Sequence, residues 1–148
     1  MDYCSVVWGT SPSIDKLLKL QKRAARLILD KPFDTPSHTM FATLGWLPIK
    51  DRIKWRTGIM AYQVVNKMTP DYLNVFKYVN EIHSRVTRQS ISNKLYVPKP
   101  RIEISKQSFT YRGAVIFNEI PDNIKNTSYH NFKHLYYTHL LRAETPGS

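Results

Sequence analysis

Proline is the residue that most limits how this chain folds, because it cannot continue a helix and withholds an N–H from a β-sheet. Seven of the nine prolines lie at positions 32, 36, 48, 70, 98, 100 and 121. Around these positions, apolar residues recur at intervals of three and four, which is the period of a helix. The pattern predicts helices over residues 13–29, 35–44, 49–67, 70–76, 105–119 and 128–142.

One stretch has the composition of strands. Leu95-Tyr96-Val97 and Ile102-Glu103-Ile104 are rich in residues that favour strands, but the two prolines between them limit the pair to a sheet edge or an extended arm. We therefore expect a mostly α-helical single domain of five to six helices, with a short extended or β arm near residues 95–104. Residues 143–148 are expected to form a tail.

Length and composition agree with one helical domain. A chain of 148 residues is long enough to bury a core, and a hydrophobic content of 42% argues against disorder. The sequence has no uninterrupted apolar run of about eighteen residues, so no membrane span is expected. Cys4 is the only cysteine, which excludes a disulfide framework and favours a reducing, intracellular setting, either nuclear or cytoplasmic.

Net charge gives the first indication of function. Twenty-two Lys and Arg against eleven Asp and Glu leave a formal charge of +11, which makes RNA or DNA the first partner to consider. In the helix predicted over 13–29, the basic residues fall within an arc of about 120°, opposite the half that holds the apolar ones. The basic residues are Lys16, Lys19, Lys22, Arg23 and Arg26, and the apolar ones are Ile14, Leu17, Leu18, Leu20, Ala24, Ala25, Leu27 and Ile28.

This basic arc has two interpretations. Lys and Arg at intervals of three and four residues present a positive ridge that fits along a phosphate backbone. The alternative is a solvated helix face with no ligand, which is the commoner case for a helix considered by itself. The helix alone does not decide between them.

A second basic stretch, residues 81–112, favours binding. It holds seven Lys or Arg against two Glu, with Tyr96, Phe109 and Tyr111 among them. Aromatic faces beside guanidinium groups can stack the bases and neutralise the phosphates of single-stranded nucleic acid. The alternative is a loop that packs on a partner domain. The candidate phosphate contacts in this stretch are Arg85, Arg88, Lys99 and Arg101.

The sequence contains no constellation typical of catalysis or metal binding. Its five glycines are too scattered for a phosphate-binding loop, and no two aspartates adjoin as in a two-metal polymerase site. His130 and His134 have the spacing of a metal-binding pair, with His139 further along the helix, but no further ligand accompanies them and we interpret them as surface residues. Cys4 lies in an apolar run and is interpreted as inert. We expect no catalytic residue, no metal and no cofactor.

Short motifs stand in a fixed order along the chain. The first are Asp2-Tyr3-Cys4-Ser5-Val6-Val7-Trp8-Gly9 and Leu20-Gln21-Lys22-Arg23-Ala24-Ala25-Arg26. The later ones are Leu44-Gly45-Trp46-Leu47-Pro48, Asp51-Arg52, Pro70 with Tyr72-Leu73, His83-Ser84-Arg85 with Thr87-Arg88, Leu95-Tyr96-Val97-Pro98-Lys99-Pro100-Arg101, Phe109 with Gly113-Ala114, Asn118, Pro121 and Phe132-Lys133. This series resembles the thumb end and the C-terminal post-thumb region of the reverse transcriptase of non-LTR (LINE-type) retrotransposons, which are transposable elements.

The resemblance implies a particular organisation. Residues 1–30 would form a thumb-end-like helical segment, and residues 31–142 a helical post-thumb region packed with it as one domain. Phe117 and Ile120 stand where the family has Trp and Leu, and both are exchanges of one apolar residue for another. The family's catalytic aspartates belong to an upstream part of the polymerase, so no catalytic residue is carried over. The chain would be a truncated or co-opted retroelement remnant, or a fragment of such a protein.

The expected function is therefore that of a non-catalytic fragment that binds RNA or single-stranded DNA through its basic surfaces. The alternative is a structural packing module, or a remnant with no independent activity. Val6, Val7 and Trp8 are the apolar residues on which a polymerase domain would pack. A membrane partner is not expected.

Overall fold

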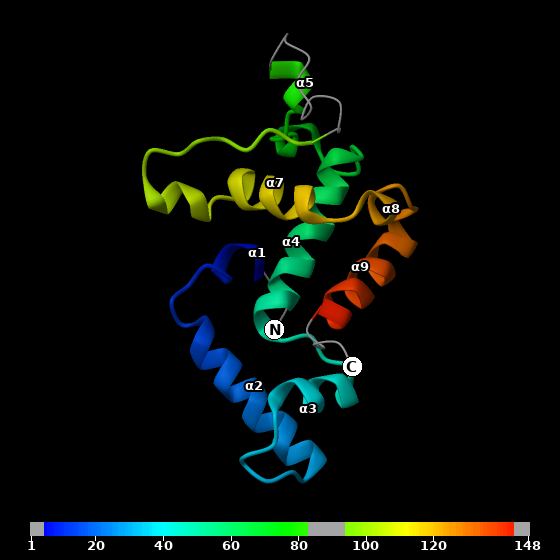
Figure 1. Cartoon of the computed structure of the whole chain (residues 1–148). Helices are drawn as coiled ribbons and strands as arrows, with labels where there is room; N and C mark the ends of the chain where they lie inside the picture. Colours follow the sequence, from blue (N-terminus) through cyan, green and yellow to red (C-terminus); the bar gives the residue numbers. More distant parts are fainter. Residues whose placement is uncertain (1–4, 83–93, 144–148) are drawn as a thin grey trace. The chain divides into compact units, whose positions relative to one another are not determined.

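The computed structural model describes residues 5–82 and 94–143, which form helices joined by turns, loops and one extended arm (Figure 1). The predicted mostly α-helical class is confirmed. Five of the described helices have eight residues or more, and each coincides with a predicted helix. The elements are α1 (Ser5–Trp8), α2 (Ile14–Leu29), α3 (Ser37–Leu44), α4 (Ile49–Val65), η1 (Asp71–Leu73), α5 (Val79–Ile82), η2 (Glu103–Gln107), α7 (Phe109–Glu119), α8 (Asp122–Lys125) and α9 (Tyr129–Ala143), where η marks a 3-10 helix.

Two of the predicted helices are shorter than expected. The range 70–76 forms only the 3-10 turn η1. The range 105–119 is interrupted at Ser108, whose extended backbone (φ −63°, ψ 149°) separates η2 from α7. The hydroxyl of Ser108 accepts a hydrogen bond from the N–H of Tyr111 at 3.3 Å. A serine in this position favours a new helix start over a continued helix.

The arm predicted near residues 95–104 pairs with the rest of the chain only at its beginning. Leu95 and Tyr78 form an isolated antiparallel bridge, and the next residues belong to neither a helix nor a strand. The prolines that follow cannot donate to a β-ladder, so the pairing does not continue. The strand character of Ile102-Glu103-Ile104 is a wrong prediction, because Glu103 and Ile104 lie in η2.

Residues in the left-handed conformation end α2, α3 and α4. Asp30, Gly45 and Lys67 have φ values of 47°, 62° and 55°. In each case the N–H of the next residue bonds to a carbonyl five positions earlier, which is the pairing of the Schellman motif. The pairs are Lys31 N–H to Arg26 O (3.1 Å), Trp46 N–H to Phe41 O (2.8 Å) and Met68 N–H to Gln63 O (2.8 Å). Gly45 is the residue type expected at such a position, and the helix end predicted there is confirmed.

Contacts group the chain into two compact units, Met1–Arg56 with Lys133–Ser148, and Thr57–Phe132. The predicted packing of 1–30 with 31–142 as one domain stays a prediction. In the first unit the indole N–H of Trp55 donates to the carbonyl of Lys133 at 3.0 Å, and the ring meets that of Tyr137 edge-on. A separate core in this unit consists of Ala25, Met40 and Phe41, packed by Leu18, Leu29, Leu44 and Trp46.

The second unit is held together by aromatic stacking and by one close glycine contact. Tyr62 of α4 stacks on Phe132 with ring centroids 4.1 Å apart, and its hydroxyl donates to the carbonyl of Thr127. Gly113 of α7 lies so close to Phe76 that a Cβ at this position would come within 2.7 Å of the ring. Phe117 and Ile120, at the C-terminal end of α7, are both buried in the helical packing.

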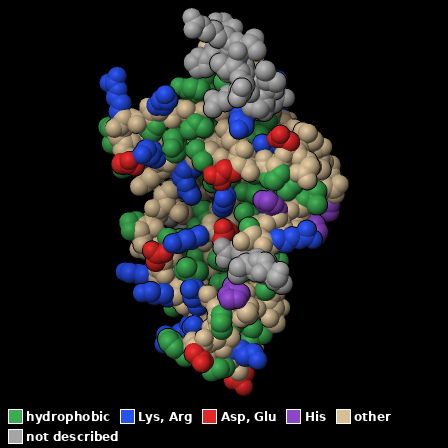
Figure 2. Space-filling view, in the orientation of Figure 1, with side chains coloured by type: hydrophobic (Ala, Val, Ile, Leu, Met, Phe, Trp, Pro, Cys, Tyr) green, Lys and Arg blue, Asp and Glu red, His purple; other side chains and the backbone are tan. Residues whose placement is uncertain are grey.

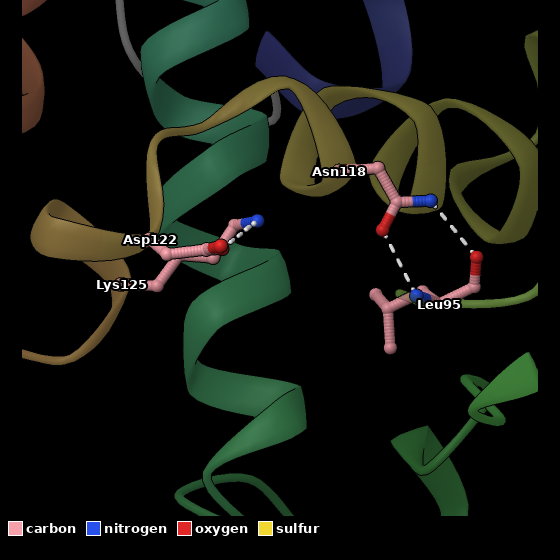
Figure 3. Close-up of polar contacts among 4 residues, drawn as sticks. All are labelled: Leu95, Asn118, Asp122 and Lys125. Carbon is pink, nitrogen blue, oxygen red and sulfur yellow. Dashed lines mark hydrogen bonds and ion pairs between the residues drawn. The ribbon is translucent and has the colours of Figure 1, made fainter. Parts of the chain in front are cut away.

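Asn118 of α7 binds the backbone of the extended arm (Figure 3). Its side-chain oxygen accepts a hydrogen bond from the N–H of Leu95 at 2.9 Å, and its side-chain nitrogen donates to the carbonyl of the same residue at 2.8 Å. Leu95 is 2% exposed, so water has little access to its backbone groups. A single amide side chain therefore takes the place of a neighbouring strand.

Replacing Asn118 is expected to destabilise the fold. Asn118→Ala leaves the N–H and the carbonyl of Leu95 without these partners, and each unsatisfied buried group costs about 1–3 kcal/mol of unfolding free energy. Urea unfolding followed by circular dichroism measures the change. Asn123→Ala, at an exposed position on α8, is the matched control and should change stability by less than about 0.5 kcal/mol. Equal effects of the two substitutions would contradict the assigned role.

Candidate nucleic-acid interface

The buried side of α2 fixes the direction of its basic residues. Ala25 is fully buried against α3. On the same face of α2, one turn earlier, the amide nitrogen of Gln21 donates to the carbonyl of Leu47, and the amide oxygen accepts from the N–H of Ile49, both at 2.8 Å. These contacts tie one side of the helix to α3 and to the start of α4, and they leave the other side facing outward.

The predicted separation of basic and apolar residues on α2 is only partly correct. Three basic residues are exposed and two are partly buried: Lys16, Lys19 and Arg23 in the first group, Lys22 and Arg26 in the second. However, Leu20, Leu27 and Ile28, which were expected on the buried half, are 55%, 78% and 58% exposed. The elements packed on α2 cover a strip around Ala25 that is narrower than the apolar half of the helix.

A groove of about 600 Å³ lies along the outward side of α2 and the loop after it. Figure 2 shows Lys and Arg side chains interleaved with apolar ones in the region of α2. Five basic and three apolar residues line the groove: Lys19, Lys22, Arg23, Arg26 and Lys31, with Leu20, Leu27 and Phe33. No Asp or Glu belongs to this lining, and within residues 5–82 and 94–143 none of the five cations forms an ion pair.

Lys31 and Phe33, which follow the end of α2, line the groove although neither was predicted as a site residue. The left-handed turn at Asp30 redirects the chain, and the Arg26 guanidinium lies 4.7 Å from the centroid of the Phe33 ring. Phe33 is nevertheless 85% exposed. The available signal was an aromatic residue in the proline-containing loop directly after a basic helix. Lys16, which was predicted, is exposed but does not line the groove.

Asp15 introduces a negative charge on the basic side of α2, because its position around the helix axis lies between those of Lys19 and Lys22, one and two turns further along. The ammonium group of Lys50 lies 2.8 Å from its carboxylate. The hydrogen bond and the charge of Lys50, with a smaller effect from Lys19, hold the pKa of Asp15 below its usual range. Both partners are more than half exposed, so the pair adds little stability. Its effect is to neutralise an acid beside the groove.

The predicted contacts beyond α2 do not share its unit. Lys99 and Arg101 are exposed on the arm that follows Leu95, in the Thr57–Phe132 unit. Arg85 and Arg88 lie outside the residues that the structure describes. The arm and the groove therefore belong to different units of the chain.

The remaining candidates from the sequence are three histidines and one cysteine. His130, His134 and His139 are exposed, as expected for surface residues. In the described part of the chain, no group of three His, Cys, Asp or Glu is placed to hold a metal ion. Cys4 lies outside that part. Of the helices described, none combines the length and the hydropathy that crossing a membrane requires.

Comparison with known proteins returned no relative. No protein-family model, no curated protein and no solved structure matches the chain. The resemblance to a retrotransposon reverse transcriptase therefore depends on the ordered motifs alone.

The ion pair beside the groove predicts a measurable change in pKa. Lys50→Gln should raise the pKa of Asp15 towards its ordinary value, because it removes the positive charge and with it the charge-assisted hydrogen bond. Since the pKa is lowered in the folded state, the stabilisation by the pair is present above the ordinary Asp pKa and is lost as the pH falls through the lowered one. NMR titration of the Asp15 carboxyl measures both values. Lys31→Gln is the control that should leave this pKa unchanged, and an Asp15 pKa that Lys50→Gln leaves unchanged would disprove the pair.

Proposed function

We propose that this chain is a non-catalytic nucleic-acid-binding module that holds RNA or single-stranded DNA in the groove along α2. The composition of the groove carries the proposal. Five cations that form no ion pair with any described residue lie beside three exposed apolar side chains. A nucleic acid matches both features, because its phosphates supply the counter-charges and its bases supply apolar faces.

A solvated helix face without a ligand explains the cations of the groove but not its exposed apolar residues. Lys and Arg are stable in water by themselves, whereas Leu27 and Phe33 gain no hydrophobic stabilisation while they stay exposed. A single exposed apolar residue is common on protein surfaces, but several of them together are typical of an interaction site. Like charges on successive turns also repel one another, and a bound polyanion relieves that repulsion.

The arm is a second candidate surface of the same chemistry. Lys99 and Arg101 are exposed, and Ile102 and Ile104 beside them are 65% and 69% exposed. It has fewer described cations than the groove, so we assign it the smaller share of binding.

We also propose that the chain corresponds to the thumb end and post-thumb region of a LINE-type reverse transcriptase. The support is that several motif residues stand where the fold depends on residue type. Gly45 is left-handed, Gly113 leaves no room for a Cβ beside Phe76, and Asn118 pairs with the backbone of Leu95. These motif residues have structural roles, as expected for a part of the polymerase that contains no catalytic residue.

Packing against a polymerase domain is a second candidate function, and the exposure of α1 favours it. Val7 is 74% exposed, whereas Ser5 on the same four-residue helix is buried. An apolar residue presented in this way gains stabilisation when a partner covers it.

Removing three charges from the groove is expected to weaken the salt dependence of binding. Each phosphate contact releases about 0.7 of a counterion from a single strand, so Lys19→Gln, Lys22→Gln and Arg23→Gln together should lower the slope of log affinity against log salt by about 2. Glutamine has a helix propensity close to that of Lys and Arg, so α2 should be retained. Fluorescence anisotropy with labelled oligouridylate and oligothymidylate over a range of salt concentrations measures the slope.

The control removes charge from exposed positions of the other unit that lie outside both candidate surfaces, by Lys67→Gln and Lys77→Gln. This variant should keep the slope of the parent protein. If only a Lys99→Gln, Arg101→Gln variant lowers the salt slope, the binding site is on the arm and not in the groove. An unchanged slope in every variant, or no binding by the parent at low salt, would leave packing as the surviving function.

The packing candidate predicts an effect of Val7 on binding to a protein. Val7→Asp should weaken binding to a purified LINE-type polymerase domain that lacks this region, by about tenfold or more if Val7 is buried at the contact. Isothermal titration calorimetry measures the affinity. Tyr72→Asp, which changes an exposed residue of the other unit, is the control. Binding that Val7→Asp leaves unchanged excludes α1 as the contact surface.

A further inference from the structure

Phe33 is the most exposed apolar residue of the groove, and its ring contacts one basic side chain. The Arg26 guanidinium lies 4.7 Å from the ring centroid, which is the distance of a cation–π contact. Phe33 is 85% exposed, so this contact covers only a small part of its surface. The backbone that carries it is constrained by the left-handed turn at Asp30 and by Pro32.

The surroundings of the ring are cationic. Arg26 lies against it, Lys31 precedes it by two residues, and Lys22 and Arg23 line the same groove one turn earlier on α2. A ligand that covers the ring therefore has to be flat and apolar at one point and anionic next to it. A nucleotide combines these features, since its base presents a π-face and its phosphate a negative charge.

From this geometry we infer that Phe33 stacks on an unpaired nucleobase, so that the groove selects single-stranded over double-stranded nucleic acid. This inference rests on the proposed function and specifies its ligand. Bases within a duplex are stacked on their neighbours and present no free face to a side chain, whereas the bases of a single strand do. The cations of the groove neutralise the phosphates of either form, so the preference for a single strand over a duplex depends on Phe33.

The competing explanation is that Phe33 only packs on Arg26 and orders the loop. Both explanations predict that the loop changes when the ring is removed. Only stacking predicts that removal of the ring weakens single-strand binding and leaves duplex binding and the salt slope intact, because Phe33 carries no charge.

The test compares Phe33→Leu with Phe33→Trp. Phe33→Leu keeps an apolar side chain but removes the π-face, and it should weaken binding of oligothymidylate and oligouridylate by about 5- to 150-fold, the range for loss of one base–aromatic stack. Phe33→Trp keeps a face for stacking and should bind at least as tightly as the parent. Binding of a DNA hairpin duplex should change by less than about twofold in both variants, because ion contacts dominate there.

Tyr72→Leu is the matched control, since Tyr72 is an aromatic residue of similar exposure (81%) in the other unit. It should leave all affinities unchanged, and circular dichroism should show that every variant keeps its helices. The inference is overturned if Phe33→Leu binds single strands like the parent, if it weakens duplex binding equally, or if Phe33→Trp loses affinity. If, in those cases, removal of the groove charges still lowers the salt slope of binding, the proposed function stands without the inference on Phe33. If the parent protein binds no nucleic acid, the proposed function and the inference both fail.

Discussion

The side chain of Gln21 joins α2 to the start of α4, and the direction of the basic surface depends on this contact. Its amide meets the carbonyl of Leu47 and the N–H of Ile49, two residues that are 1% and 3% exposed. Without it, two buried backbone groups would lack these partners, which is costly. Together with the burial of Ala25, this contact sets the rotation of α2 about its axis. The basic residues face outward because the opposite side is occupied.

The charges of the groove exceed what the helix itself requires. Arg26 in the last turn of α2, and Lys31 just beyond it, lie at the negative end of the helix dipole and stabilise the helix there. Lys19, Lys22 and Arg23 lie further from that end and gain little from it. Helix stability therefore does not account for their clustering without ion pairs to described residues. Lys50 strengthens this surface by neutralising Asp15.

Much of the fold could be predicted because its causes are local. The long helices α2, α3, α4, α7 and α9 each contain enough turns for a periodic apolar pattern, and a proline or glycine lies near at least one end of α2, α3, α4 and α7. The short helices α1, α5 and α8 have four residues each, too few to show a period. The apolar spacing of residues 105–119 is continuous, but Ser108 separates η2 from α7. Its side chain accepts a hydrogen bond from the backbone, which favours the start of a new helix over a continued one. The apolar pattern alone does not decide between a continued helix and a new helix start.

By itself, the sequence determined the helical class, the excess of positive charge and the five basic residues on one side of α2, since all three follow from composition and spacing within single segments. The tertiary structure decided which part of that helix is covered, and so exposed Leu20 and Leu27 against expectation. It also decided that Phe33 joins the groove. That placement depends on the left-handed turn at Asp30 and on the contact of Arg26 with the ring, which arise only when the chain turns back on itself.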